Sequence, residues 1–174
     1  MQSLPHESVL QLLAEISVAF VGFSMLASVF RSSRGDDLVR FADFRNVAET
    51  ALLATVGSLT PLILHSLEWE DDAVWRLASG GVAVLWTLGA FAANRRQNFL
   101  RERFKERPFR IGFVHAFSTV VVLLGFSNAL LPSASLGGRH LLLLALCLVQ
   151  AAQLFLLAGF EGVETPARPR DGSA

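Results

Sequence analysis

The sequence is poor in charge, and it has a single cysteine and a single lysine. Only 17% of its 174 residues are Asp, Glu, Lys or Arg, whereas an average soluble domain has about 25%. The lone Cys147 excludes an intramolecular disulfide, a Cys-rich zinc site and covalently attached haem. The lone Lys105 lies in a charged segment, so no apolar segment has the amine that a Schiff base requires.

The sequence also lacks the motifs that mark common enzyme classes. It contains no glycine-rich phosphate loop ending in Lys-Ser or Lys-Thr, no His-Glu-x-x-His and no Gly-x-Ser-x-Gly. Its 15 basic and 15 acidic residues give a net charge of zero, which does not favour a polyanionic partner. We therefore expect no catalytic activity, no cofactor, no metal site and no nucleic-acid partner.

What the chain has in abundance is apolar sequence, since 52% of its residues are hydrophobic. Five long apolar runs lie at residues 10–30, 47–67, 73–93, 111–131 and 141–160. Each has roughly the 20 residues needed to cross a bilayer. The sequence predicts an all-α integral membrane protein with five transmembrane helices in one domain over residues 1–160, followed by a disordered cytoplasmic tail over residues 161–174.

Basic residues are distributed unevenly among the segments that connect these runs. Thirteen of the 15 lie after the first run, after the third run and in the tail, while Arg76 and Arg139 alone lie on the other side. Because basic segments stay in the cytoplasm, this distribution predicts the N-terminus outside and the C-terminus in the cytoplasm. The expected location is a bacterial inner membrane, whose anionic inner leaflet attracts the basic segments.

The two basic connections also contain apolar residues at helical spacing. In the first, Leu38, Phe41 and Phe44 follow Asp36, which is expected to cap a helix whose apolar face lies on the inner headgroup layer. In the second, bulk attraction to an anionic surface explains the basic residues, with specific recognition of lipid headgroups as the alternative. The expected headgroup contacts are Arg95, Arg96, Arg101, Arg103, Lys105 and Arg107.

Each run has one face of small and polar residues at near-heptad spacing. Helices in a bilayer pack through such faces, because lipid already solvates leucine. The pattern predicts a left-handed bundle in which Glu15, Ala19 and Gly22 of the first run are buried. Pro61 is expected to kink the second run, since it removes one backbone hydrogen bond and crowds the carbonyl of Gly57. The stripe of the third run is Arg76, Gly80, Ala83, Thr87, Ala90 and Asn94.

The depth of a side chain in the membrane follows from its position along a run, at a rise of about 1.5 Å per residue. By this count, the ionisable and amide side chains within the runs fall into two layers. Because an unpaired charge in a span costs about 2.5 to 3.5 kcal/mol, Glu15 and Arg76 are expected to form an ion pair. His140 borders Arg139 and is expected to lie at the wet membrane edge. The outer layer holds Glu15, Arg76, His65 and Asn128, the inner layer holds Glu49 and His115, and Gln150 lies near the centre.

Two interpretations of these layers remain open. In the structural one, the outer ion pair is a buried clamp, Glu49 is held by Arg45 or by headgroups, and the histidines are neutral core residues. In the functional one, the layers connect through Thr55, Thr87 and Gln150 into a passive ion or proton pathway.

Two further functions are compatible with the sequence. A non-catalytic scaffold or assembly subunit would bind another membrane protein or further copies of itself. A haem protein would hold iron between His65 and His140, which share the outer level on different runs.

Overall fold

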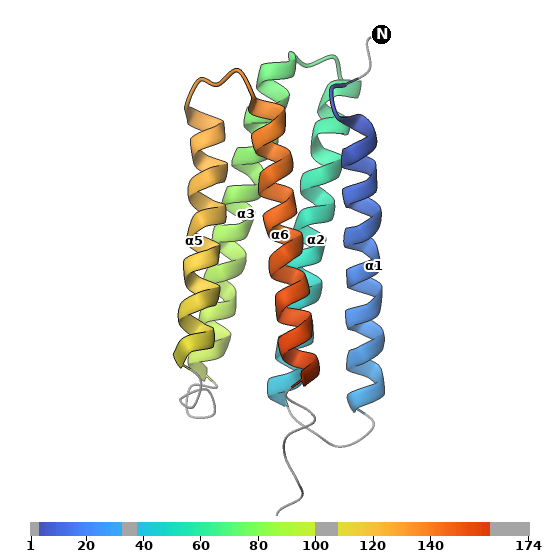
Figure 1. Ribbon diagram of the computed structural model, residues 1–174, viewed down its shortest axis with the longest axis vertical. Coiled ribbons are helices and arrows are strands. Elements are labelled where there is room, and N and C mark those ends of the chain that lie inside the picture. The colour runs from blue at the N-terminus through green and yellow to red at the C-terminus, as the bar shows by residue number, and fades with distance from the viewer. Residues whose placement is uncertain (1–3, 33–37, 100–107, 161–174) are drawn as a thin grey trace, which may run out of the picture.

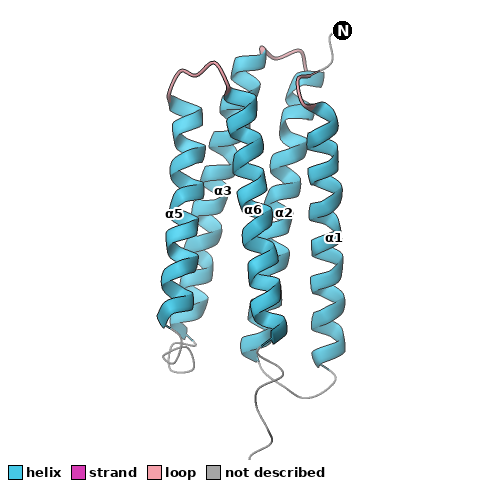
Figure 2. Cartoon of the chain, in the orientation of Figure 1, coloured by secondary structure: helices cyan, strands magenta, loops and turns pink. Residues whose placement is uncertain are grey.

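The computed structural model describes residues 4–32, 38–99 and 108–160, and all regular secondary structure in this part of the chain is helical (Figure 2). Successive helices run in opposite directions, so α1, α3 and α6 begin at the end of the bundle where α2 and α5 finish (Figure 1). We call this end the N-terminal end. The described helices are α1 (Glu7–Ser32), α2 (Leu38–Ser66), α3 (Asp71–Phe99), α5 (Pro108–Leu130) and α6 (Leu136–Phe160).

Four of these helices, α1, α2, α3 and α6, are long and apolar enough to cross a membrane. In α5 the apolar stretch among the described residues, Val114–Leu130, is shorter. The prediction of an all-helical fold is confirmed, and the four long helices are compatible with a membrane protein. The predicted tail, residues 161–174, lies outside the described residues.

The sequence explains locally where the helices begin. Asp71 and Asp72 lie in the first turn of α3, where carboxylates compensate the positive end of the helix dipole. Pro108 occupies the first position of α5, where its missing N–H is not needed for helical hydrogen bonding. Pro61 lies inside α2, which remains helical through it as far as Ser66.

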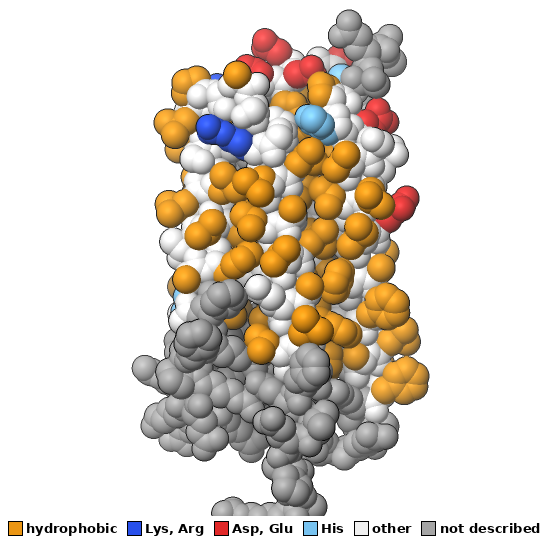
Figure 3. Space-filling view, in the orientation of Figure 1, with side chains coloured by type: hydrophobic (Ala, Val, Ile, Leu, Met, Phe, Trp, Pro, Cys, Tyr) orange, Lys and Arg blue, Asp and Glu red, His pale blue; other side chains and the backbone are white. Residues whose placement is uncertain are grey.

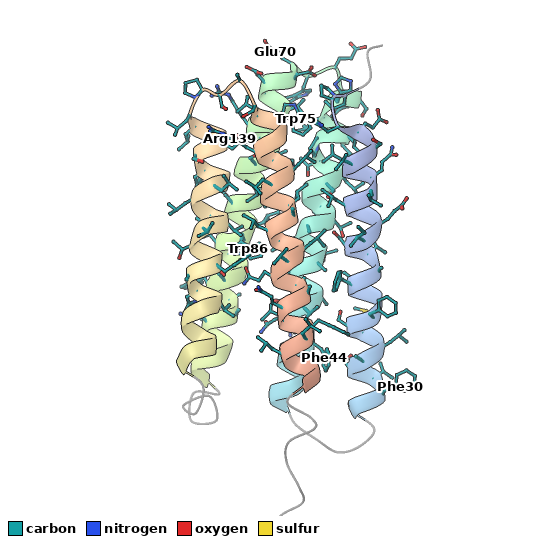
Figure 4. All side chains as sticks on the ribbon, in the orientation of Figure 1. Phe30, Phe44, Glu70, Trp75, Trp86 and Arg139 are labelled. Atoms are coloured by element: carbon teal, nitrogen blue, oxygen red, sulfur yellow. The ribbon has the colours of Figure 1, made fainter. Side chains whose placement is uncertain are left out.

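The expectation that Phe44 lies on the headgroup layer is wrong. Its side chain is buried, and its ring makes an edge contact with the ring of Phe155 in α6, with centroids 6.1 Å apart. Figure 4 shows Phe44 beside α6 at the end of the bundle opposite the N-terminal end. The second helix is therefore already part of the bundle at this residue. Asp36 and the side chains of Leu38 and Phe41 lie outside the described part.

Helix α6 is central, because it packs against each of the other four, whereas α1 packs chiefly on α2. Small residues close the seam between α3 and α5. A Cβ atom on Gly125 would lie 2.8 Å from Cβ of Ala83, and one on Gly80 would lie 3.3 Å from Cβ of Ala129. This part of the predicted third stripe is thus a packing seam, where two backbones approach closely.

The outside of the bundle is apolar along its length. Figure 3 shows hydrophobic side chains over most of the visible face, with most of its visible charged side chains gathered at the N-terminal end. Many large hydrophobic side chains, including Leu12, Phe23, Leu26 and Leu88, are more than half exposed. A soluble monomer rarely exposes so much contiguous apolar surface, whereas a lipid-facing one requires it.

Candidate functional site

A buried hydrogen-bond network joins four helices near the N-terminal end of the bundle. His140 of α6 lies with its Nε2 3.0 Å from the carbonyl oxygen of Gly57 in α2 and its Nδ1 2.9 Å from Oγ of Ser79 in α3. Asn128 of α5 donates from Nδ2 to Oγ of Ser79 at 2.8 Å and to the carbonyl oxygen of Leu136 at 3.0 Å. All three polar side chains are buried.

Pro61 explains why the carbonyl of Gly57 is available. In a regular helix this oxygen accepts from the N–H four residues later, and Pro61 stands at that position without an N–H. A carbonyl left unpaired in an apolar interior costs about 1 to 3 kcal/mol. The ring of His140 supplies the missing donor from another helix.

The carbonyl also fixes the direction of the hydrogen bonds. An oxygen of this kind only accepts, so Nε2 of His140 carries the proton and Nδ1 of the neutral ring is an acceptor. The hydroxyl of Ser79 then donates to Nδ1 while it accepts from the amide of Asn128. Each of these side chains is consequently held in one orientation by its neighbours.

Trp75 packs against the imidazole, and this contact corrects the expectation that His140 is wet. The two ring centroids are 5.7 Å apart, and His140 has no exposed surface. Gly137 allows the close approach, because a Cβ there would lie 3.2 Å from the Trp75 ring. Figure 4 shows Trp75 near the N-terminal end of the bundle.

The predicted haem site is not assembled. Both ring nitrogens of His140 are used within the bundle, so neither can bind iron without breaking a hydrogen bond of the network. Nδ1 of His65 lies 3.3 Å from a carboxylate oxygen of Asp71 across the turn between α2 and α3. In the part of the chain that the structure describes, no three His, Cys, Asp or Glu side chains are grouped as metal ligands.

Within the part of the chain that the structure describes, two buried side-chain oxygens have no hydrogen-bond donor. One is Oδ1 of Asn128, in the network, and the other is Oε1 of Gln150, further along α6. Nε2 of Gln150 donates to Oγ of Ser118 in α5 at 3.3 Å. Buried acceptors of this kind are common sites for an ordered water molecule.

The other predicted pathway residues do not join these two. Asn128 and Gln150 are the two of the eight candidates that are buried. Glu49 accepts from Arg45 one turn earlier in α2 at 2.7 Å, as the structural interpretation expects. Thr87 and His115 are exposed on the outside of α3 and α5, and the Thr87 hydroxyl donates to the carbonyl of Ala83 in its own helix.

The predicted ion pair between Glu15 and Arg76 is wrong. Glu15 is exposed on α1 and Arg76 is half-buried on α3, and these two helices are not packed closely together. Neither side chain makes an ion pair or hydrogen bond within the described residues. Matching depth does not bring two residues together when their helices are not neighbours.

The predicted buried stripe of α1 points outward as well. Among the described side chains of α1, those of Leu10, Ala14, Ser17 and Ser24 are buried, and both serines donate to carbonyls of their own helix. The opposite side carries an exposed stripe at intervals of four and three residues, which we call the α1 outer face. Its members are Ser8, Leu12, Glu15, Ala19, Gly22 and Leu26.

The expected headgroup contacts lie mostly beyond the described residues. The guanidinium carbon of Arg95 lies 5.6 Å from the centroid of the Phe91 ring, near the end of α3. This contact holds the side chain along the helix. The side chain of Arg96 and residues Arg101, Arg103, Lys105 and Arg107 lie outside the described part.

Sequence reasoning missed Ser79 and the role of His140. The signal that could have found them is the four-residue spacing of Gly57 and Pro61, which predicts one unpaired carbonyl and hence one buried donor on another helix.

No family model matches the chain, and no curated protein and no solved structure matches it either.

The network predicts an energetic coupling between His140 and Ser79. We expect His140→Phe and Ser79→Ala together to cost less than the sum of the single variants, with a coupling of about 0.6 to 1.7 kcal/mol. Unfolding of the detergent-solubilised protein by titrated SDS measures it. Ser24→Ala is the matched control, because the Ser24 hydroxyl bonds within its own helix. A His140–Ser79 coupling no larger than the His140–Ser24 value would contradict the network.

Proposed function

We propose that the chain is a multi-pass protein of a bacterial inner membrane, with five transmembrane helices in a left-handed bundle, its N-terminus outside and its C-terminus in the cytoplasm. Four long apolar helices and the alternating direction of all five described helices support this proposal. The thirteen basic residues on one side favour its orientation. Arg95 and the basic residues after it would then face the anionic inner leaflet.

Reporter fusions test the orientation. A cytoplasmically active reporter joined after Leu131 or Glu70 is expected to be silent, and one joined at the C-terminus is expected to be active, because these points fall on opposite sides of the membrane. A periplasmically active reporter at the same three points should give the reverse pattern. Cytoplasmic activity after Glu70 together with silence at the C-terminus would exclude the proposed threading.

We further propose that the protein is a non-catalytic assembly subunit that binds another transmembrane helix along the α1 outer face. The observation that carries this proposal is Glu15, which is exposed and makes no ion pair or hydrogen bond with the other described residues. It lies eight residues, about 12 Å, from the start of α1 and inside the apolar stretch Glu7–Phe30. Ionisable residues in transmembrane segments normally face protein or water, because lipid does not solvate them.

The surroundings of Glu15 fit a helix-binding surface. Ala19 and Gly22 follow it by one and two turns on the same exposed side, and an added Cβ on Gly22 would meet nothing within 4 Å. Small residues at such spacing let a second helix approach closely, while a polar side chain contributes a hydrogen bond. The other face of α1 is already occupied by α2 and α6.

A leucine at Gly22 tests the assembly function. Gly22→Leu has room in the isolated chain, so we expect it to leave thermal stability in detergent unchanged while the complex extracted from native membranes falls to monomer size. Gly81→Leu is the matched control, since Gly81 is also exposed and also has nothing within 4 Å, but it lies on α3. The proposal would be excluded if wild-type protein had monomer size in mild detergent and a crosslinker placed at Ala19 reacted with lipid alone.

The second candidate function is a passive ion or proton pathway through the bundle. The observation that favours it is the pair of buried acceptors without donors, Oδ1 of Asn128 and Oε1 of Gln150, because water or a cation would satisfy both. Such a pathway predicts that liposomes with wild-type protein dissipate a proton gradient faster than empty liposomes. Gln150→Leu should abolish the difference, and Thr87→Val, on the exposed side of α3, should not. Wild-type liposomes as tight as empty ones from pH 5 to 8 would exclude the pathway.

A further inference from the structure

We propose that residues 4–6, which precede α1, form a hinged cover that controls the access of water to the buried network at the N-terminal end of the bundle. This inference goes beyond the proposed assembly function and does not depend on the α1 outer face. It rests on the burial of Leu4, on the backbone conformation of His6 and on the oxygen of Asn128 that has no donor among the described residues.

Leu4 packs directly above the network. Its side chain is buried although it lies before α1, and it belongs to the same apolar cluster as Trp75 and Leu136. Trp75 packs against the ring of His140, and the carbonyl of Leu136 accepts from the amide of Asn128. The cluster that contains Leu4 is therefore in contact with two members of the network.

Pro5 and His6 form the turn that folds Leu4 back onto the bundle. The N–H of Glu7 donates to the carbonyl of Leu4 at 3.2 Å, and His6 has a φ of 68°. Proline at the first central position and a positive φ at the second are features of a type II turn, in which the second position favours glycine. Histidine adopts this left-handed conformation at a cost in free energy, so the turn that keeps Leu4 in place is strained.

The position of the strain makes His6 a hinge. Its carbonyl accepts from the N–H groups of Val9 and Leu10, so this side of the residue is fixed to the first turn of α1. A rotation about its N–Cα bond to a negative φ would lift Leu4, relieve the strain and leave α1 intact. Burial of one leucine side chain opposes this rotation, which makes the open form a minor state of the folded protein.

The network offers a binding position to water that enters. Nδ2 of Asn128 donates to Ser79 and to the carbonyl of Leu136, which fixes the orientation of the amide and leaves Oδ1 as an acceptor without a donor among the described residues. A water molecule supplies such a donor. The position of Leu4 then decides whether bulk water can reach this oxygen.

A static anchor is the competing interpretation of Leu4. An apolar residue just before a helix often packs against one in its first turns and so fixes the entry of the chain, and Leu10 lies in the same cluster as Leu4. A permanent anchor does not need a strained turn, because glycine or asparagine at residue 6 would hold it at lower cost. The histidine therefore favours the hinge.

Labelling of thiols by a charged, water-borne methanethiosulfonate in lipid nanodiscs tests the cover. Ser79→Cys in a Cys147→Ala background reports on the network, and the natural Cys147, buried further along α6, reports on the rest of the bundle. Leu4→Ala is expected to raise the labelling rate at Ser79→Cys about tenfold and that of Cys147 less than about twofold, because it removes most of the burial that keeps the cover closed. An unchanged rate at Ser79→Cys, or an equal rise at Cys147, would overturn the inference.

Two variants of His6 test the hinge without changing a buried side chain, since His6 is exposed. His6→Val is expected to raise the labelling rate at Ser79→Cys about three- to tenfold, because a β-branched residue rarely adopts a positive φ. His6→Gly should not raise it, because glycine accepts this conformation. Both variants lack the imidazole, so the difference between them reports on the backbone.

The remaining outcomes separate the hinge from the static anchor. Equal labelling rates in the Val and Gly variants would overturn the hinge and leave Leu4 as an anchor. A parallel rise at Cys147 in the Val variant would show that the whole bundle has loosened, which would also overturn it. Neither result bears on the assembly function, which Gly22→Leu tests.

Discussion

The arrangement of the bundle depends on one hydrogen bond, from Nε2 of His140 to the carbonyl of Gly57. Pro61 removes the ordinary donor for this oxygen, and an apolar interior offers no water to replace it. A donor from another helix is therefore obligatory. Because the ring donates through Nε2, it accepts through Nδ1. The hydroxyl of Ser79 must then donate to the ring, and its oxygen accepts from the amide of Asn128. One missing N–H thus sets the relative rotation of α2, α3, α5 and α6.

This requirement leaves the interior near the N-terminal end of the bundle with little spare hydrogen-bonding capacity. The polar side chains near the N-terminal end are largely committed to one another, and the hydroxyls of Ser58 and Thr55 bond within their own helix. An ion passing through this region would have to compete with His140 for the carbonyl of Gly57. Glu15, in contrast, is exposed on the outside of α1 and makes no ion pair or hydrogen bond with the other described residues.

The sequence was sufficient for the number of described helices and their approximate limits, since these follow from apolar length. It was not sufficient for α1, which has two stripes of heptad spacing on opposite sides. Leu10, Ala14 and Ser17 form one, and Glu15 and Ala19 belong to the other. Both contain small residues, so periodicity alone cannot decide which one the bundle buries. The serines of the inner stripe bond to their own backbone and need no partner, whereas a carboxylate has no such option.

The sequence also does not show which helices pack against one another. The depths of Glu15 and Arg76 were inferred from the same counting that placed Asn128 and His140, yet the second pair shares a network and the first does not. Depth gives one coordinate of a residue in a bundle, and the order of helices around the bundle gives the rest. Since α1 lies at the edge, packed chiefly on α2, its Glu15 has no oppositely charged partner among the described residues. An unpaired carboxyl in a lipid-facing position costs about 2.5 to 3.5 kcal/mol in the isolated protein. In the proposed assembly subunit, a partner helix on the α1 outer face would take Glu15 out of contact with lipid and so remove this cost. The same residue would then destabilise the isolated protein and stabilise the complex.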